Sequence, residues 1–252
     1  MSDPVPLPAP TTTPTPLPRE LKPLHWAIVM AACLFVQVAL AFGWALISML
    51  PPLLSGARPE KPEPGPAMLL VLQSVDFAIA IGGAWWFACR RLGLSLRAGL
   101  DVHPTSRRIV LFSIGAGIFC LAAKEGLVAI DPSAPPEMLM KLIDTPAGFY
   151  SFALLGLLSP IFEEIYYRGF MFRALENGAG TGAAATIVTI WFVALHVPQY
   201  WPSAGAIASI LVLSLTTTLL RVRTGSIVPG MIAHAVYNWI VIAIAIVARH
   251  AG

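Results

Sequence analysis

Seven apolar runs, each long enough to cross a bilayer, follow one another along this 252-residue chain. A helix of about 20 apolar residues spans the hydrocarbon core of a membrane, where the backbone must satisfy its own hydrogen bonds. The runs cover residues 26–50, 67–89, 109–130, 147–175, 181–197, 204–220 and 225–248. With 57% hydrophobic and only 12% charged residues, the chain is too apolar for a soluble domain. The sequence therefore predicts an all-α polytopic membrane protein with about seven transmembrane helices, and its net charge of +3 gives no reason to expect nucleic acid as a partner.

The chain divides into three segments of different composition. Residues 1–25 are rich in proline and threonine, cannot bury enough surface to fold, and are expected to form a disordered cytoplasmic tail. Residues 26–145 hold three transmembrane helices and their loops, and Pro51 and Pro52 are expected to end the first helix. Residues 146–252 hold the other four runs, and the polar motifs among them predict a catalytic membrane domain with a core of helices.

The basic residues predict how the chain is oriented, because Lys and Arg accumulate on the cytoplasmic side of a membrane. If seven spans alternate in direction, most basic residues fall on one side, namely Arg19, Lys22, Arg90, Arg91, Arg97, Arg107, Arg108, Arg168, Arg173, Arg221 and Arg223. Those on the other side are Arg58, Lys61, Lys141 and Arg249. The amino terminus and the opening of the site are therefore expected in the cytoplasm, and the carboxyl terminus outside.

Two adjacent glutamates, Glu163 and Glu164, stand in the fourth apolar run and are followed by Arg168. A charged group is costly inside a bilayer, so ionisable residues there normally face a protein interior or a watery cavity and mark functional sites. At about 100° per residue, Glu164 and Arg168 share one helix face and can pair, whereas Glu163 is turned away. One glutamate is thus expected to support the structure while the other stays free.

Two later runs contain further polar pairs at helical spacing. Phe192 and His196 lie four residues apart in the fifth run, and His234 and Asn238 lie four apart in the seventh. A single histidine in an apolar helix is more often a satisfied core residue than a catalyst. Polar clusters on three separate spans favour a common site instead.

Together these residues supply what hydrolysis of a peptide bond requires, which is a base for water, a group that orients the water and donors for the oxyanion. Glu163 could take the proton while His196 holds the same water. His234 and Asn238 could donate hydrogen bonds to the oxyanion. Glu164, held by its arginine, would keep the helix rotated so that Glu163 faces inward. No cofactor is needed in this arrangement.

Other interpretations use the same groups. Glu163, His196 and His234 are a ligand set of catalytic zinc, but the chain has no HExxH helix and would then need another base. Covalent catalysis is disfavoured because no serine or cysteine stands in a nucleophile motif. The polar clusters could also form an interhelical network in a catalytically silent binding or immunity-type protein. A transporter using Asp76 with the site residues is disfavoured, because no matching broken helices are present.

The three motifs in this order resemble the signatures of the CPBP family. EEIYYR matches EExxxR, FVALH matches FxxxH and HAVYN matches HxxxN, and each lies within an apolar run. The family comprises CAAX-processing endopeptidases and bacteriocin-processing or abortive-infection proteins. The resemblance covers about the last hundred residues and does not extend to the first three spans.

The resemblance implies an intramembrane endopeptidase whose helices surround a conical cavity open to the cytosol. It implies that Glu163 and His196 activate the water and that His234 and Asn238 bind the oxyanion. The implied substrate is a protein or peptide at the membrane, either a prenylated protein or a leader peptide, with membrane lipid as the other partner.

One distance argues against this site if the helices are straight. Counted inward from Ala147, Glu163 lies roughly 24 Å along the fourth span, near the cytoplasmic side of a core about 30 Å thick. His196, counted outward from Thr181, lies about as far toward the outside. The two residues meet only if the fourth helix starts later and continues to Leu175, or if the fifth is tilted or begins deeper in the cytoplasm.

Overall fold

The structure is a computed structural model that describes residues 20–56, 65–131, 133 and 143–251. Within these residues it contains helices and turns and no strand. Seven helical segments are long and apolar enough to cross a membrane, which confirms the predicted all-α polytopic architecture. The predictions for the tail at residues 1–19, and for the loop cations Arg58, Lys61 and Lys141, lie outside the described residues.

The first three spans are α1 (Pro23–Leu54), α2 (Pro66–Trp85) continued by the π-helix η1 (Trp86–Arg90), and α4 (Arg107–Ala129). A short helix, α3 (Leu96–Leu100), lies between the second and third spans. The fourth span combines α6 (Pro146–Glu163), the π-helix η2 (Glu164–Met171) and α7 (Phe172–Ala179). The last three are α8 (Thr181–Tyr200), α9 (Ala204–Thr224) and α10 (Val228–Ala251).

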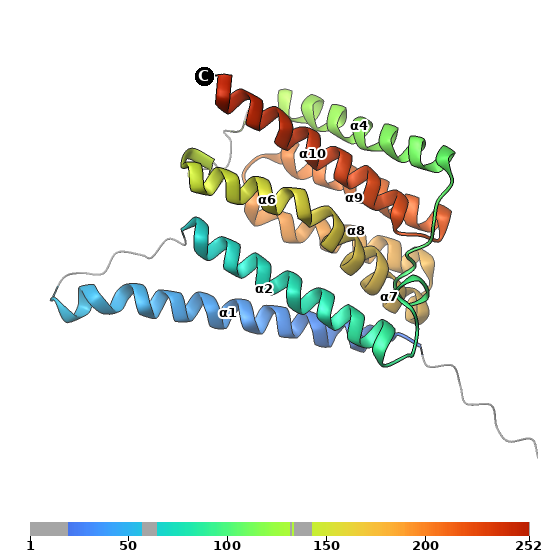
Figure 1. Cartoon of the computed structure of the whole chain (residues 1–252), viewed down its shortest axis with the longest axis horizontal. Helices are drawn as coiled ribbons and strands as arrows, with labels where there is room; N and C mark the ends of the chain where they lie inside the picture. The colour runs from blue at the N-terminus through green and yellow to red at the C-terminus, as the bar shows by residue number, and fades with distance from the viewer. Residues whose placement is uncertain (1–19, 57–64, 132, 134–142, 252) are drawn as a thin grey trace, which may run out of the picture.

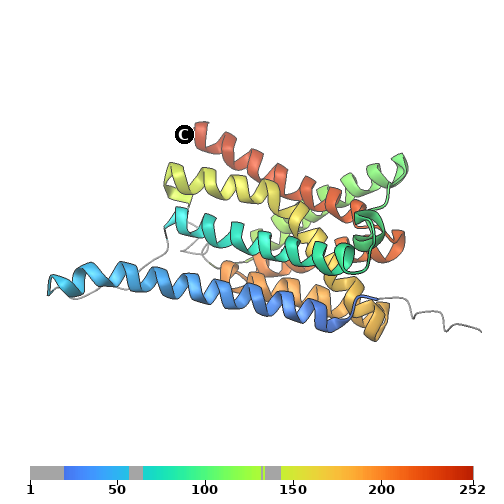
Figure 2. The ribbon, with the colours of Figure 1, turned by 60° about the horizontal axis from the view of Figure 1, so that its bottom comes forward.

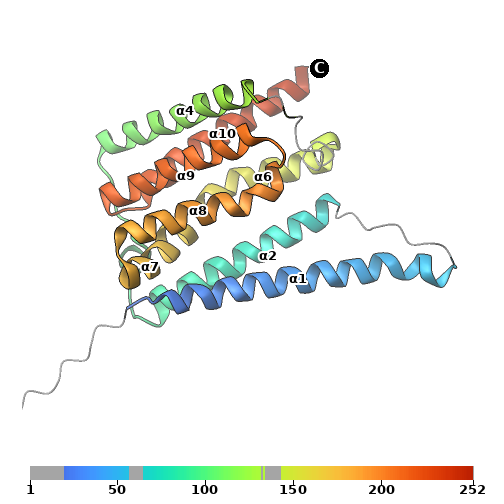
Figure 3. The ribbon, with the colours of Figure 1, turned by 180° about the vertical axis from the view of Figure 1, so that it is seen from behind.

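The spans lie side by side as a layered bundle (Figure 1). α1 and α2 form a pair at one edge, α4 lies at the opposite edge, and the other spans lie between them, as Figure 3 also shows. In the turned view of Figure 2, α1 (blue) lies along the lower edge and α10 (red) near the upper edge. α4 packs on α9 and α10, α8 packs on α9, and α6 contacts both α10 and α2. The start of α1 and the carboxyl terminus lie at opposite ends of the bundle, as an odd number of spans requires.

Residues at the helix ends explain where several helices begin and stop. Proline stands in the first turn of α1, α2 and α6, where its missing N–H costs no hydrogen bond. The hydroxyls of Ser106, Thr145 and Ser203 accept backbone N–H groups at the starts of α4, α6 and α9. Gly225 ends α9 with a φ of 66°, a left-handed conformation that glycine adopts without strain.

Two helix boundaries differ from those expected. α1 begins at Pro23 and continues to Leu54, so the prediction that Pro51 and Pro52 end it was wrong. Proline's fixed φ is compatible with a helix and its main defect is the missing donor, so the helix can continue for one more turn. That turn is closed by the Ser55 N–H, which donates to the Pro51 carbonyl at 3.1 Å. The fourth span continues to Ala179, beyond the expected end at residue 175.

The outside of the bundle is apolar and its centre contains charged groups. Phe35, Phe112 and Val247 are 73%, 67% and 67% exposed, whereas Glu164 and Arg168 are completely buried. Water would make such a surface unfavourable, but lipid chains solvate it. Together with the seven apolar spans, this distribution identifies an integral multi-pass membrane protein.

Candidate active site

The EEIYYR motif lies where the fourth span changes from an α-helix to a π-helix. From Glu164 to Met171 the backbone follows the wider spacing, and the Phe172 N–H donates to the Tyr167 carbonyl five residues earlier. Such π-helical turns are rare and often lie at functional sites. The sequence had predicted a regular helix here, because the spacing of apolar residues does not distinguish the two.

Glu164 and Arg168 form a fully buried ion pair within this turn. Arg168 Nη1 lies 3.2 Å from Glu164 Oε1, and both side chains have 0% exposure. Arg168 also donates to the hydroxyls of Ser214 at 2.9 Å and Thr218 at 3.4 Å, both on α9. The predicted pairing is therefore present. The orientation analysis had placed Arg168 among the cytoplasmic cations, but the structure places it inside the bundle, where a buried charge requires these partners.

Phe192 of α8 connects this pair to both histidines. The Arg168 guanidinium lies over the Phe192 ring, 4.5 Å from its centroid, in a cation–π contact. The same ring has its centroid 4.5 Å from that of His196 and 6.0 Å from that of His234. The three motifs, which are far apart in sequence, thus meet around one buried aromatic ring.

His234 lies between the two glutamates. Its Nδ1 is 3.0 Å from Glu164 Oε1, and its Nε2 is 3.9 Å from Glu163 Oε2. Because Glu164 is paired with an arginine and accepts hydrogen bonds, Nδ1 is the donor in this contact. The 3.9 Å separation is too long for a direct hydrogen bond but allows one water molecule to contact both groups. The Glu163 side chain is 16% exposed and that of Glu164 is 0% exposed, so Glu163 is the one that can meet solvent.

His196 is held by its own helix. Its Nδ1 lies 2.7 Å from the Phe192 carbonyl oxygen, and because a carbonyl only accepts, Nδ1 is again the donor. The neutral ring then presents Nε2 as an acceptor. On its other side the ring stacks on Tyr200, with centroids 6.3 Å apart. Within the part of the chain that the structure describes, His196 has no hydrogen bond to either glutamate, and Phe192 connects it to them.

Asn238 binds α6 through both hydrogens of its amide group. Nδ2 donates to the Gly156 carbonyl at 3.1 Å and to the Ser159 hydroxyl at 3.2 Å. The Gly156 carbonyl lacks its usual helical donor because residue 160, four positions later, is a proline without an N–H. The Asn238 amide therefore satisfies a carbonyl that Pro160 leaves free, and any contact with a substrate requires it to exchange one of these bonds.

The length of the fourth span explains how Glu163 and His196 can lie at the same depth in the membrane. Because α7 continues to Ala179, α7 and α8 form a hairpin around Gly180. Glu163 precedes that turn by 17 residues and His196 follows it by 16 residues, so they lie at about the same height in antiparallel neighbours. Of the first condition stated above, the structure contains the continuation of the fourth helix past Leu175 but not the later start, because the span begins at Pro146.

Comparison with known families agrees with this geometry. Residues 145–240 match the family model described as type II CAAX prenyl endopeptidase Rce1-like. Residues 145–240 thus form a domain similar to this family, an Rce1-like domain. This match is consistent with the CPBP resemblance of the motifs and covers the fourth to sixth spans and the first part of the seventh. Neither the curated proteins nor the solved structures gave a match to the chain.

The three residues that could bind zinc do not form a metal site in the described part of this domain. Among the residues that the structure describes, no three His, Cys, Asp or Glu side chains converge closely enough to hold one metal ion. Glu163 and His234 face each other, but His196 is connected to His234 through contacts of both rings with Phe192. The proposed ligand set of Glu163, His196 and His234 therefore does not fit a metal in this conformation.

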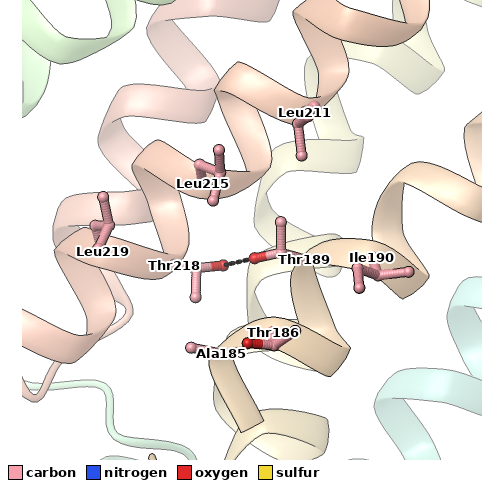
Figure 4. Close-up of a pocket in the computed structure, with 8 residues that line it drawn as sticks. All are labelled: Ala185, Thr186, Thr189, Ile190, Leu211, Leu215, Thr218 and Leu219. Carbon is pink, nitrogen blue, oxygen red and sulfur yellow. Dashed lines mark hydrogen bonds between the residues drawn. The ribbon is translucent and has the colours of Figure 1, made fainter. Parts of the chain in front are cut away.

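Sequence reasoning missed the α9 residues that hold the Arg168 guanidinium. Ser214 and Thr218 lie four residues apart in an apolar run, a spacing that could have indicated a polar face opposite the buried arginine. The Thr218 hydroxyl also contacts that of Thr189 on α8, at 3.4 Å. Figure 4 shows this contact beside a cavity of about 270 Å³ between α8 and α9 that is otherwise mostly apolar. The Rce1-like domain thus extends its polar network to the wall of that cavity.

Gly230 on α10 was also missed. A β-carbon added there would lie 3.1 Å from Glu164 Oε2 and 3.3 Å from the Thr217 carbonyl oxygen. These contacts are tight, and the Glu164 side chain cannot move away because Arg168 and His234 both hydrogen-bond to its carboxylate. The small residue lets the buried carboxylate fit against α10.

Proposed function

We propose that the chain is an intramembrane endopeptidase that hydrolyses a peptide bond with a glutamate-activated water. The single observation that supports this best is the position of His234, which contacts a fully buried Glu164 and faces a partly exposed Glu163. A purely structural network would be expected to pair all its charges. Here one carboxylate of the Rce1-like domain is fixed while its neighbour remains available.

In the proposed reaction Glu163 removes a proton from a water molecule, and the resulting hydroxide attacks the scissile carbonyl. The Nε2 atom of His196, which is an acceptor when Nδ1 donates to Phe192, holds the second hydrogen of this water. The proton on Glu163 then passes to the leaving amine as the peptide bond breaks. Each group returns to its starting protonation state.

We assign the oxyanion to His234 and Asn238. His234 can donate from Nε2 only as an imidazolium, because Nδ1 already donates its hydrogen to Glu164. Asn238 joins when the substrate carbonyl replaces the Ser159 hydroxyl as acceptor, leaving the contact with Gly156 intact. Donors that are placed where charge develops stabilise the transition state more than the ground state.

The substrate class follows from the location of the domain and from the family it matches. An active site within membrane helices acts on a protein or peptide at the membrane. The matching family is named for CAAX prenyl endopeptidases, so a prenylated protein is one candidate, and a leader peptide is the other. Both present an extended peptide attached to a membrane-bound portion.

The test compares wild type with Glu163→Gln in cells, by sequencing protein termini in membrane and soluble fractions. Glutamine keeps the shape of glutamate but cannot take a proton, so we expect termini produced by wild type to fall by roughly 10²- to 10⁴-fold. Glu125→Gln is the matched control, because Glu125 is 62% exposed and its salt bridge within the described part of the chain is to Lys124. The termini that disappear also show whether the substrate is prenylated or a leader peptide.

An unchanged set of termini in Glu163→Gln would contradict the endopeptidase and favour the silent binding protein. Metal dependence is measured in the same preparation. We expect a strong chelator to leave cleavage by the purified protein largely intact and no metal to co-purify at one per chain. Stoichiometric zinc with chelator-sensitive cleavage would show that Glu163, His196 and His234 act as ligands instead.

A further inference from the structure

A groove of about 850 Å³ runs along the outside of the bundle between α4 and α9, away from the proposed active site. Most of its wall is apolar, and one end carries two arginines. The lining residues that matter here are Phe112, Phe119, Leu219, Arg108, Arg223 and Thr224. The groove therefore combines a hydrocarbon-like channel with a cationic end.

The groove is open because α4 carries a small residue on this side. A β-carbon added at Gly115 would meet no atom within 4 Å, whereas one added at Gly117 would collide with Ala233 and Val236 of α10. Gly117 is thus needed for helix packing and Gly115 is not. The space beside Gly115 exists without being required by contacts within the chain.

The length of the groove fits one leaflet of a bilayer. From Arg108 to Phe119 is eleven residues of helix, or roughly 17 Å at 1.5 Å per residue. Half of a hydrocarbon core about 30 Å thick is close to this value. Because α4 begins and α9 ends at the cationic end, both arginines stand at the level where the headgroups of that leaflet lie.

The two arginines differ from the other cations at this end of the bundle. Arg173 and Arg221 are paired with Asp101. Arg108 and Arg223 are exposed, and within the described residues neither takes part in a salt bridge or a side-chain hydrogen bond. Their charges are therefore available to an anion from outside the chain.

We propose that this groove binds an anionic glycerophospholipid, with its phosphate between Arg108 and Arg223 and one acyl chain against Phe112 and Phe119. The charge at the end of the groove favours an anionic lipid over a zwitterionic one or a second apolar helix. This inference does not depend on the proposed function.

A lipid in this groove would also contact the helix that supports the candidate site. Leu219 lines the groove, and its neighbour Thr218 on α9 accepts a hydrogen bond from Arg168. A bound lipid would restrict α9 and so stabilise the buried ion pair. The bound phospholipid is therefore expected to raise the thermal stability of the whole bundle.

The test titrates purified full-length protein in detergent with phosphatidylglycerol or phosphatidylcholine of identical acyl chains, using native mass spectrometry and thermal unfolding. We expect preferential binding of phosphatidylglycerol and a rise in Tm of several degrees. The double variant Arg108→Gln/Arg223→Gln should bind it roughly tenfold or more weakly, because both phosphate contacts are lost. Arg90→Gln/Arg97→Gln removes the same charge from exposed positions outside the groove and should bind like wild type.

A second pair of variants tests the groove itself without changing charge. Gly115→Leu places a side chain in the open space and should displace the acyl chain, whereas Gly126→Leu, on the same helix and equally unobstructed, should not. Gel filtration and circular dichroism establish that each variant is folded. Equal affinity for both lipids, or phosphatidylglycerol binding that survives both groove variants, would overturn the proposal. So would a dimer that Gly115→Leu disrupts while lipid binding is unchanged.

Discussion

Glu163 and Glu164 are neighbours in sequence but meet different surroundings, because consecutive residues of a helix point about 100° apart. Glu164 faces α10, where His234 contacts its Oε1, and Arg168 on the next turn of the same span contacts the same oxygen. Its second oxygen, Oε2, is buried with no hydrogen-bond partner among the described residues. Glu163 faces the partly solvated side. Two adjacent residues thus differ in role: the Glu164 carboxylate stabilises the fold, and the Glu163 carboxylate can react.

This difference predicts that the same substitution changes the free energy of unfolding by unequal amounts at the two positions. Glu164→Gln removes the charge that balances Arg168 and leaves a buried guanidinium with neutral partners only, so we expect the free energy of unfolding to fall by about 3–5 kcal/mol. Glu163→Gln alters a partly exposed group and should change it by less than about 1 kcal/mol. Thermal unfolding in one detergent measures both.

The control for this comparison is Arg168→Gln/Glu164→Gln, which removes both charges. Replacing a complete buried pair by neutral groups costs less than breaking it, so the double variant should be more stable than Glu164→Gln alone. If Glu164→Gln and Glu163→Gln were equally stable, the buried pair would not be a structural element, and the division of roles between the glutamates would be lost.

At the scale of helices, the sequence located the spans and the faces that meet, but not the local geometry of the site. The positions of the spans and the shared face of Phe192 and His196 depend only on apolar run length and the helical repeat, so they could be predicted from the sequence. The π-helix at Glu164 and the bond from Asn238 to the Gly156 carbonyl were not. The first adds one residue to a turn without changing the apolar pattern, and the second depends on which helix lies opposite Pro160.

The connection between α4 and α9 at the other end of the bundle is held by one carboxylate. Asp131, just after α4, accepts hydrogen bonds from the Ser203 hydroxyl at 2.6 Å and the Gly205 N–H at 2.8 Å. These bonds, with those from Ser133, hold the pKa of the Asp131 carboxyl well below its usual range, the Ser203 bond having the largest effect. Because the folded-state pKa is lowered, the stabilisation is complete above the unfolded pKa near 3.9 and is lost as the pH falls below it.

We therefore expect Asp131→Asn to lower the Tm at neutral pH and to narrow its difference from wild type below about pH 4. The measurement is thermal unfolding of both proteins in one detergent between pH 7 and pH 3. Asp144→Asn serves as the control, since Asp144 is a carboxylate at the same end of the bundle and, among the described residues, its side chain makes no hydrogen bond or salt bridge with α9. A difference between wild type and Asp131→Asn that stays constant down to pH 3 would show that ionised Asp131 does not hold this connection.

At the scale of the whole molecule, one end of the bundle concentrates cations from separate segments. Side-chain contacts join them, because Asp101 after α3 pairs with Arg173 and Arg221, and Arg91 contacts His25 at the start of α1. Four parts of the chain that are distant in sequence therefore share one basic end. Since positive charge is retained on the cytoplasmic side, we expect this end to face the cytoplasm.

The orientation can be tested with reporters fused to the full chain in a bacterial host. Alkaline phosphatase folds only outside the cytoplasm, so a fusion after Gly252 should be active, because seven spans carry the carboxyl terminus across the membrane. A fusion after Gly225, which follows the sixth span, should be inactive, because that turn lies at the basic end beside Arg221. A fluorescent protein that matures only in the cytoplasm should give the reverse pattern at the two positions. Activity after Gly225 with none after Gly252 would invert the bundle and place the partly exposed Glu163 on a path from the outside.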